Sequence, residues 1–256
     1  MKVVGIIPAR LGATRFPGKP MATLHGMPMV GHCYHRTRLA SGINATYVAT
    51  CDDEIADYIN GIGGSVIMTS TSHTRATTRT AEALEIIESE RNEKIDIVVM
   101  VQGDEPLIQP DTIAETLRHF DDPKVEIVNI MSRLHSYEYF ADKNNVKVVV
   151  NNKNDALYFS RETIPSPWQD KESIPMFMQT GIIAFRRDVL MHFNSMEETL
   201  LEKIESVDMN RVLETGGSIR MVPTDTMTIG VDTPEELEYA EALLKDDKTM
   251  SEYLTK

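Results

Sequence analysis

A loop rich in fixed positive charge follows the first apolar run of this chain. Arg10, Arg15 and Lys19 lie in the stretch PARLGATRFPGKP, among glycines and prolines. Guanidinium groups fit phosphate oxygens as planar forks, and lysine adds a point charge. The prolines restrict the loop, so less entropy is lost when it orders on a ligand. Because the stretch lacks both GxGxxG and GxxxxGK[ST], we predict a polyphosphate-binding loop of another kind; the alternative is an exposed loop with solvated charges.

Two aspartates that are far apart in the sequence each follow an apolar run. Asp104 lies in VQGDEP, and Asp232 lies in GVDTP, just before a predicted helix. Mg²⁺ is typically bound by one or two carboxylates together with substrate phosphates. The pair therefore suits a metal-assisted phosphoryl or nucleotidyl transfer. The alternatives are a turn aspartate at 104 with Glu105 solvated, and a helix-capping role for Asp232, which the local pattern alone favours.

Alternating apolar and helical segments must position these side chains. The apolar runs are residues 3–9, 46–53, 65–70, 96–106 and 126–132, and the helical segments are 27–42, 53–61, 76–91 and 110–121. This alternation predicts an α/β fold with βαβ units and a mostly parallel sheet that is covered on both faces. Ligands of such sheets bind at the carboxyl ends of the strands, which is where the cationic loop and Asp104 fall.

The pattern changes between residues 133 and 190. Short turn-bounded runs predict an antiparallel insertion, which is often a dimerisation or lid element. Residues 197–214 are predicted to be helical, residues 219–223 to form a strand, and Thr233 to cap a further helix. We predict a single domain over residues 1–246 and a frayed polar tail over residues 247–256.

Composition narrows the partners. The formal net charge of −13 argues against a nucleic-acid partner. No apolar run is long enough to span a membrane, and the N-terminus has the pattern of a strand and not of a signal peptide. Cys33 and Cys51 give neither a disulfide framework nor a metal spacing. We expect a cytoplasmic protein that concentrates positive charge at one loop for a small anionic substrate.

Several motifs together resemble one family. They occur in order from residue 3 to about residue 244 and read IPARLGATRFPGKP, ATCDDE, VQGDEPLI, VKVVV, ALYFSRETIP and GVDTPEELE. This set resembles the 3-deoxy-manno-octulosonate cytidylyltransferases, or CMP-Kdo synthetases. The resemblance implies a nucleotidyltransferase fold, a homodimer and Mg²⁺. It also implies transfer of CMP from CTP to a sugar acid with release of pyrophosphate, a step in lipopolysaccharide biosynthesis.

The resemblance also implies residue roles. Arg10 and Lys19 would bind the triphosphate, and Arg15 would lie nearer the reacting groups or the sugar acid. Asp104 and Asp232 would hold Mg²⁺. No residue is assigned as general base, because Mg²⁺ can acidify the hydroxyl that it binds. The nucleotide site would comprise Pro8, Ala9, Arg10, Lys19, Thr50, His73, Thr77, Arg79 and Gln102.

Two segments depart from the family pattern. Where the family reads His-x-Ser-Gly-Thr-Asp-Arg, residues 73–79 include Arg75, Ala76 and Thr78. The added methyl at Ala76 leaves the choice between CTP and UTP open, unless the segment is simply the solvated start of a helix. Where the family reads His-Leu-Gly-Ile-Tyr-x-Tyr, this chain runs from Gln179 to Phe185 and loses three hydrogen-bonding side chains, which predicts a changed acceptor. The alternative is that these side chains, Phe185 above all, face away from the sugar.

The acceptor side has further candidates. Gln179 and Arg161 are expected to bind the acid, although Arg161 could instead brace the insertion. Glu202 and Glu205 are predicted to share a helix face and meet sugar hydroxyls, or else to be solvated. We therefore predict a cytidylyltransferase for Kdo or a related 2-keto-3-deoxy acid. The alternatives are a paralogue with another acceptor, and a catalytically silent nucleotide-binding protein, against which the retained Arg10, Lys19 and aspartates speak.

Overall fold

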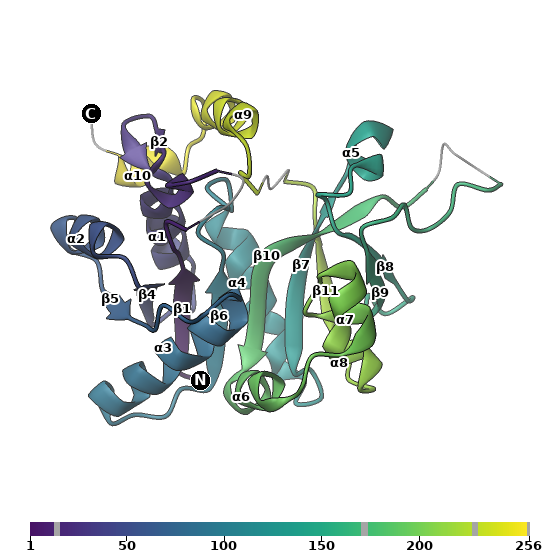
Figure 1. Cartoon of the computed structure of the whole chain (residues 1–256), viewed down its shortest axis with the longest axis horizontal. Coiled ribbons are helices and arrows are strands. Elements are labelled where there is room, and N and C mark those ends of the chain that lie inside the picture. The colour runs from purple at the N-terminus through teal and green to yellow at the C-terminus, as the bar shows by residue number, and fades with distance from the viewer. Residues whose placement is uncertain (13–15, 170–173, 227–229, 255–256) are drawn as a thin grey trace.

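A nine-stranded sheet forms the centre of the molecule, which we describe from a computed structural model over residues 1–12, 16–169, 174–226 and 230–254 (Figure 1). Its main path runs β11-β7-β10-β6-β1-β4-β5. Neighbouring strands on this path are parallel except at β10, which is antiparallel to both β6 and β7. The strands of the path are β1 Val3–Pro8, β4 Ala45–Thr50, β5 Val66–Met68, β6 Ile97–Val101, β7 Ile127–Arg133, β10 Phe177–Arg186 and β11 Arg220–Thr224. The predicted α/β class with a mostly parallel sheet is confirmed.

Helices connect these strands. They are α1 Met29–Leu39, α2 Asp53–Gly61, α3 Ala76–Arg91, α4 Pro110–Arg118, α5 Tyr137–Ala141, α6 Arg187–Ser195, α7 Leu200–Glu205, α8 Asn210–Glu214, α9 Pro234–Leu244 and α10 Met250–Tyr253. The predicted bounds of α2 and α3 are confirmed. The helix predicted over residues 197–214 is divided into α7 and α8, with Ser206 in a left-handed conformation at the break. Thr233 caps α9 as predicted, through a capping box with Glu236.

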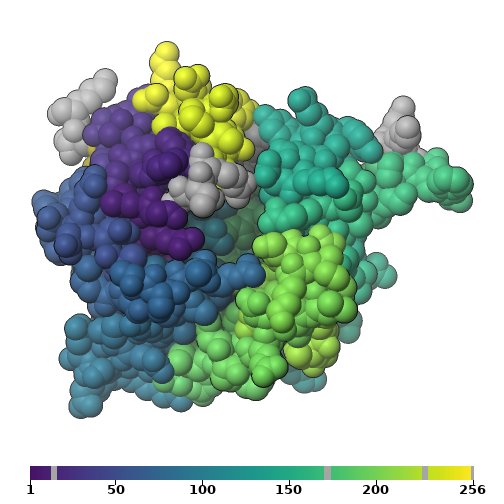
Figure 2. All heavy atoms as spheres, viewed as in Figure 1, coloured from purple at the N-terminus to yellow at the C-terminus, as the bar shows by residue number. Residues whose placement is uncertain are grey.

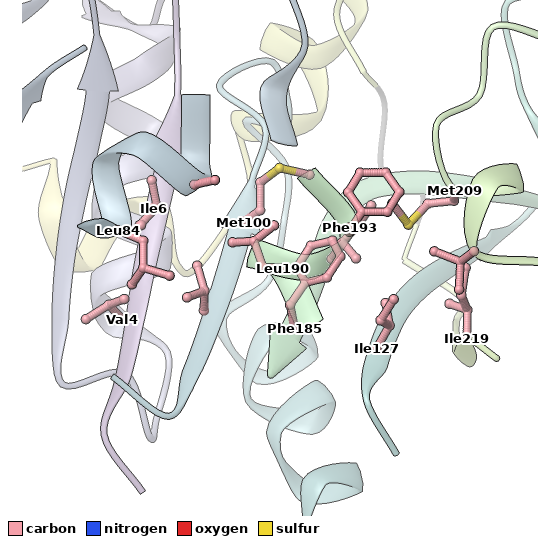
Figure 3. Close-up of a cluster of buried hydrophobic side chains, with 14 of the residues drawn as sticks. Val4, Ile6, Leu84, Met100, Ile127, Phe185, Leu190, Phe193, Met209 and Ile219 are labelled. Atoms are coloured by element: carbon pink, nitrogen blue, oxygen red, sulfur yellow. The ribbon is translucent and has the colours of Figure 1, made fainter. Parts of the chain in front are cut away.

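Both faces of the sheet are buried, as the continuous apolar strands predict. Along β1, Val4 and Ile6 pack into one core cluster, whereas Val3 and Ile7 pack into the other. Figure 3 shows the first cluster, in which Leu84 lies on the same side as Val4 and Ile6. Since alternate residues of a strand point to opposite faces, the two cores hold the strand rigid and fix where its carboxyl end lies.

The predicted antiparallel segment is present, but it is not separate from the central sheet. β10 lies between β6 and β7, and only β8 Lys147–Val150 and β9 Ala156–Ser160 extend beyond the main path. Figure 1 shows β10 running from this hairpin into the middle of the sheet. β10 enters the core because its second half, Ile182 to Phe185, is fully apolar and buried. The predicted element at 133–190 therefore supplies a central strand as well as a hairpin.

The C-terminal segment does not fray as predicted. Residues 247–253, predicted to fray, pack against α1: Asp247 forms an ion pair with Arg36 at 2.8 Å, and the ring of Tyr253 stacks on His35. The Tyr253 hydroxyl also lies 2.8 Å from Nδ1 of His32. Arg36 is fully buried, so its charge needs these partners. Within the part of the chain that is described, no helix is long and apolar enough to cross a membrane.

Candidate active site

A cavity of about 330 Å³ opens at the carboxyl end of β6, beside the amino-terminal half of the antiparallel strand β10. We call it the large cavity. Figure 2 shows the surface hollowed between the N-terminal part of the chain, in purple and blue, and the teal and green second half. Its lining includes Asp104 and Asp232 on one wall and Arg161 and Gln179 from the second half. These predicted site residues come from distant parts of the sequence, and the sheet topology brings them together.

Lys19 bridges the two predicted metal-binding aspartates. Its Nζ lies 2.7 Å from Oδ2 of Asp104 and 2.8 Å from Oδ1 of Asp232. Asp104 follows β6, Asp232 precedes α9, and the backbone N–H of Val231 donates to the carbonyl of Asp104, which holds the two loops together. Burial lowers the pKa of Lys19, but the charges and hydrogen bonds of the two carboxylates outweigh it and raise that pKa above its ordinary value.

The Lys19 ammonium shows that this position attracts a cation. Two carboxylate oxygens converge on one nitrogen within hydrogen-bond distance. Among the described residues, no group of three or more His, Cys, Asp or Glu side chains is placed to hold a metal by itself. Mg²⁺ commonly takes only one or two carboxylates and completes its shell with water and phosphate oxygens. The donor set at Asp104 and Asp232 therefore fits Mg²⁺ together with a nucleotide.

A second cavity of about 100 Å³ lies beside the predicted nucleotide residues. We call it the small cavity. Its lining is Pro8, Ala9, Arg10, His73, Thr74, Arg75, Ala76 and Arg79. Arg10 donates from Nη1 to the carbonyl of His73 at 3.4 Å, and the ring of His73 pairs with Glu82. Nη2 of Arg79 is buried and has no hydrogen-bond partner among the described residues.

Three other residues predicted to bind the nucleotide do not line the small cavity. Gln102 lines the large cavity, whereas the side chains of Thr50 and Thr77 are buried. The Thr50 hydroxyl accepts from the backbone N–H of Asp52, whose carboxylate accepts from the N–H of Leu11 in the cationic loop. The structure therefore gives Thr50 a supporting role under the loop in place of the predicted direct contact. Arg15 lies outside the described residues.

On the acceptor side, Arg161 and Gln179 both line the large cavity. Nε2 of Gln179 donates to Oδ1 of Asn129 at 2.8 Å, which fixes the amide. Nε of Arg161 donates to the carbonyl of Glu205 at 2.7 Å, and Nη1 donates to that of Lys143 at 2.9 Å. The guanidinium is therefore held in place at the edge of the cavity.

The placement of Glu202 and Glu205 corrects their predicted contact with sugar hydroxyls. Glu202 is fully buried and accepts two hydrogen bonds from Arg211, at 2.7 and 2.6 Å. Glu205 accepts from the hydroxyl of Ser160 at 2.8 Å and from the backbone N–H of Arg161 at 2.9 Å. Neither carboxylate lines the large cavity. Glu202 is therefore not solvated, Glu205 is only partly exposed, and internal partners take up the oxygens of both carboxylates.

The segment that departs from the family at residues 179–185 is divided between cavity and core. Ile183 lines the large cavity, but Phe185 is fully buried in the core beside Leu190 (Figure 3). Phe185 therefore packs in the core and does not line the large cavity, in agreement with the alternative interpretation for this residue. Gly181 must be glycine, because a Cβ there would lie 2.8 Å from the side chain of Gln102.

Sequence reasoning missed Glu105, which it treated as solvated. Glu105 is 5% exposed and lines the large cavity. Its Oε1 accepts from the backbone N–H of Gly181 at 2.8 Å, and Oε2 has no partner among the described residues. Burial, with the neighbouring charge of Asp104, raises the pKa of Glu105 to about 8. The local sequence gives no signal for this, since the burial comes from the packing of β10 over the loop.

The raised pKa of Glu105 predicts that the stability of the protein depends on pH. The folded protein keeps the Glu105 proton up to about pH 8, whereas the unfolded chain loses it near 4.5. The free energy of unfolding should therefore fall as pH rises between these values, by at most about 1.4 kcal/mol per pH unit. Glu105→Gln keeps the acceptor for Gly181 and cannot ionise. Urea unfolding at pH 5 and pH 8 should show a smaller loss for this variant than for the wild type.

The exposed Glu90→Gln variant is the matched control, and it should keep the wild-type pH dependence. If the free energy of unfolding of Glu105→Gln falls between pH 5 and pH 8 as much as that of the wild type, Glu105 ionises freely in the folded protein.

Two further residues shape the part of the large cavity that is predicted to take the acceptor. Asp208 lines the large cavity, accepts from the hydroxyl of Thr77 at 3.1 Å, and has its pKa raised by burial. Lys147 is fully buried and donates from Nζ to the carbonyls of Asp142 and Asn145, at 2.7 Å each. It thereby fixes the loop whose Asn145 lines the large cavity. The position of Lys147 inside the apolar run VKVVV was the sequence feature that could have indicated its burial.

Comparison with known proteins gives a consistent result. The profile of the family described as Cytidylyltransferase matches residues 4–221. A 3-deoxy-manno-octulosonate cytidylyltransferase of Trichlorobacter lovleyi is 41% identical over 256 residues, which cover 96% of this chain and 99% of the relative. One from Geobacter metallireducens is also 41% identical, over 249 residues that cover 93% and 96% of the two chains.

Solved structures agree. The chain is similar to CMP:2-keto-3-deoxy-manno-octonic acid synthetase complexed with CTP, with a TM-score of 0.87, 37% identity, and coverage of 95% of this chain and 98% of that one. A putative glucose-1-phosphate thymidylyltransferase from Bacillus anthracis, at 16% identity and a TM-score of 0.67 over 96% of each chain, shares the fold.

Proposed function

The chain belongs to the 3-deoxy-manno-octulosonate cytidylyltransferase family, and we propose on that basis that it transfers CMP from CTP to 3-deoxy-manno-octulosonate (Kdo), with release of pyrophosphate. The observation that carries the proposal is the placement of Lys19 between Asp104 and Asp232 at the wall of the large cavity. The family profile supports the class of reaction. Lys19 and the two aspartates supply the positive charge and the metal-binding carboxylates that this reaction needs. The reaction belongs in the cytoplasm, as a step toward lipopolysaccharide.

The reaction exchanges one phosphorus–oxygen bond for another. The anomeric hydroxyl oxygen of the acceptor bonds to the α-phosphorus of CTP, the bond from that phosphorus to the bridging oxygen of pyrophosphate breaks, and the hydroxyl proton passes to solvent. Mg²⁺, held by Asp104 and Asp232, would supply positive charge to the phosphates. Lys19 and Arg10 stabilise the charge on the triphosphate, and Arg15 is proposed to act nearer the reacting groups. In-line positioning is the main task of the remaining residues.

The small cavity is proposed to take the cytosine ring. It lies beside the cationic loop, its lining includes Pro8 and Ala9, and the Nη2 donor of Arg79, which also lines it, has no partner among the described residues. A buried donor discriminates against a base that leaves it unsatisfied. The acceptor is proposed to occupy the large cavity, between Gln102 and Gln179, with Arg161 at its edge.

A second copy of this chain is the proposed partner. Trp168 is 88% exposed and Leu157 on β9 is 59% exposed, both within the element predicted to dimerise. These two exposed apolar side chains make this element the proposed association surface. Light scattering should give the mass of a dimer for the wild type and a larger monomer fraction for Trp168→Ala.

A pyrophosphate-release assay tests the function. The protein is incubated with Mg²⁺, CTP or UTP, and a panel that contains Kdo and other 2-keto-3-deoxy acids. We expect release with CTP and Kdo. Release only with another acid would instead assign a paralogue, and CTP binding without release across the panel would assign a silent nucleotide-binding protein.

A further inference from the structure

Arg75 lies on the wall between the two cavities. It lines both the large cavity and the small cavity, together with Thr74 and Ala76 on either side of it. Its backbone is extended and forms the N-terminal boundary of α3. A side chain at this point can reach the space where the nucleotide and the acceptor must meet.

The guanidinium of Arg75 has little to hold it. Among the described residues its one ion pair is to Glu198, at 3.7 Å, and the two side chains are 30% and 45% exposed. An exposed pair at this distance contributes little to stability. By contrast, the guanidinium of Arg161 is fixed by bonds of 2.7 and 2.9 Å to backbone carbonyls. Arg75 can therefore exchange Glu198 for a ligand at small cost, whereas Arg161 would have to give up its hydrogen bonds to backbone carbonyls in order to move.

The charges of the large cavity show which ligand group would recruit Arg75. The acidic side chains in its described lining are Asp104, Glu105, Asp208, Asp232 and Glu236, whereas the arginine and lysine side chains there are Arg75 and Arg161. Although Glu105 keeps its proton near neutral pH, the other four carboxylates leave this space acidic, and an acid acceptor brings another negative charge into it. Its carboxylate needs a cation away from Asp104 and Asp232, and a planar guanidinium binds a carboxylate through two parallel hydrogen bonds.

We propose that Arg75 is a specificity-determining residue that leaves Glu198 and binds the carboxylate of the acceptor during turnover. This inference rests on the proposed function, because it concerns the acceptor of that reaction. It places the recognition of the acid on α3, beside the nucleotide site. The departure of residues 73–79 from the family pattern then affects acceptor binding, whereas from sequence it was expected to affect the choice of base.

The test is steady-state kinetics of Arg75→Gln with CTP, Mg²⁺ and Kdo. We expect the KM for Kdo to rise about 10- to 100-fold, as for the loss of a hydrogen bond to a charged group. The KM for CTP and kcat should stay within about twofold, since no reacting atom loses a contact. Arg75→Lys keeps the charge and should recover part of the Kdo affinity. Arg118→Gln, which removes an exposed arginine of α4, is the matched control and should behave as the wild type.

Three results would overturn the inference. An unchanged KM for Kdo would make Arg75 a solvated surface residue. A rise in the KM for CTP alone would assign it to the nucleotide, and failure of Arg75→Lys to recover any affinity would exclude a charge interaction. The wild type is assayed alongside, and if it does not turn over Kdo at all, the proposed function fails and not the assignment of Arg75.

Discussion

Asp104→Asn should lower turnover by about 10³-fold while leaving the fold intact. The size follows from the loss of a preorganised charge in the transition state, which typically costs 10²- to 10³-fold, and from the added loss of a metal ligand. Asparagine is isosteric, and the Asp104 carbonyl that accepts from Val231 is unaffected by the change. The side chain is partly exposed, so no buried charge is left unpaired.

Two measurements on Asp104→Asn check this prediction. Pyrophosphate release gives kcat, and urea unfolding gives the midpoint that reports stability. Asp57→Asn, on the exposed face of α2, is the matched control and should retain wild-type turnover. A near-normal kcat for Asp104→Asn would remove Asp104 from the mechanism. Loss of turnover together with a large loss of stability would instead give the residue a structural role.

Lys19→Met should reduce kcat/KM for CTP by about 10²- to 10³-fold, because the triphosphate loses a fixed positive charge. The same change should strengthen the binding of Mn²⁺, used as a probe for Mg²⁺, in the absence of nucleotide. The Lys19 ammonium lies against both aspartates, so it competes with a divalent ion for their oxygens. Methionine keeps the length of the apolar stem but leaves the carboxylates without that competitor.

Electron paramagnetic resonance titration measures the Mn²⁺ affinity, and pyrophosphate release measures the activity. Lys153→Met, in the exposed turn between β8 and β9, serves as the control for loss of a lysine. Weaker Mn²⁺ binding in Lys19→Met would contradict the competition, since it would mean that Lys19 supports the metal site. Unchanged kcat/KM for CTP would show that Lys19 does not contact the triphosphate.

Several features of the site could be predicted from local sequence. The apolar runs and helical segments predicted the sheet, and the position of PARLGATRFPGKP directly after the first run placed Arg10 and Lys19 at a carboxyl end. VQGDEP placed Asp104 likewise. These predictions succeed because strand and helix patterning is local, and because parallel strands bring their carboxyl ends to one edge.

Burial was less predictable. Glu202 and Glu205 share a helical spacing that resembles a solvated face, yet Glu202 is buried against Arg211 and Glu205 is hydrogen-bonded to Ser160 of β9. Glu105 lies beside the predicted site residue Asp104 but is buried under β10. The tail was expected to fray because its composition is polar, whereas Asp247 and Tyr253 satisfy the buried Arg36. In each case a partner distant in sequence decides the environment.

The sequence by itself determined the class of fold and the position of the cationic loop after the first strand. It also singled out Asp104 and Asp232 as candidate site residues. These features depend on residue types and on short-range periodicity. Only the tertiary structure decided that Lys19 lies between aspartates 85 and 213 residues away, that β10 enters the central sheet, and that Arg75 borders both cavities. The physical reason is that a charge takes its pKa, its burial and its partner from the groups folded around it. Those groups are selected by packing across the whole chain and not by neighbours in sequence.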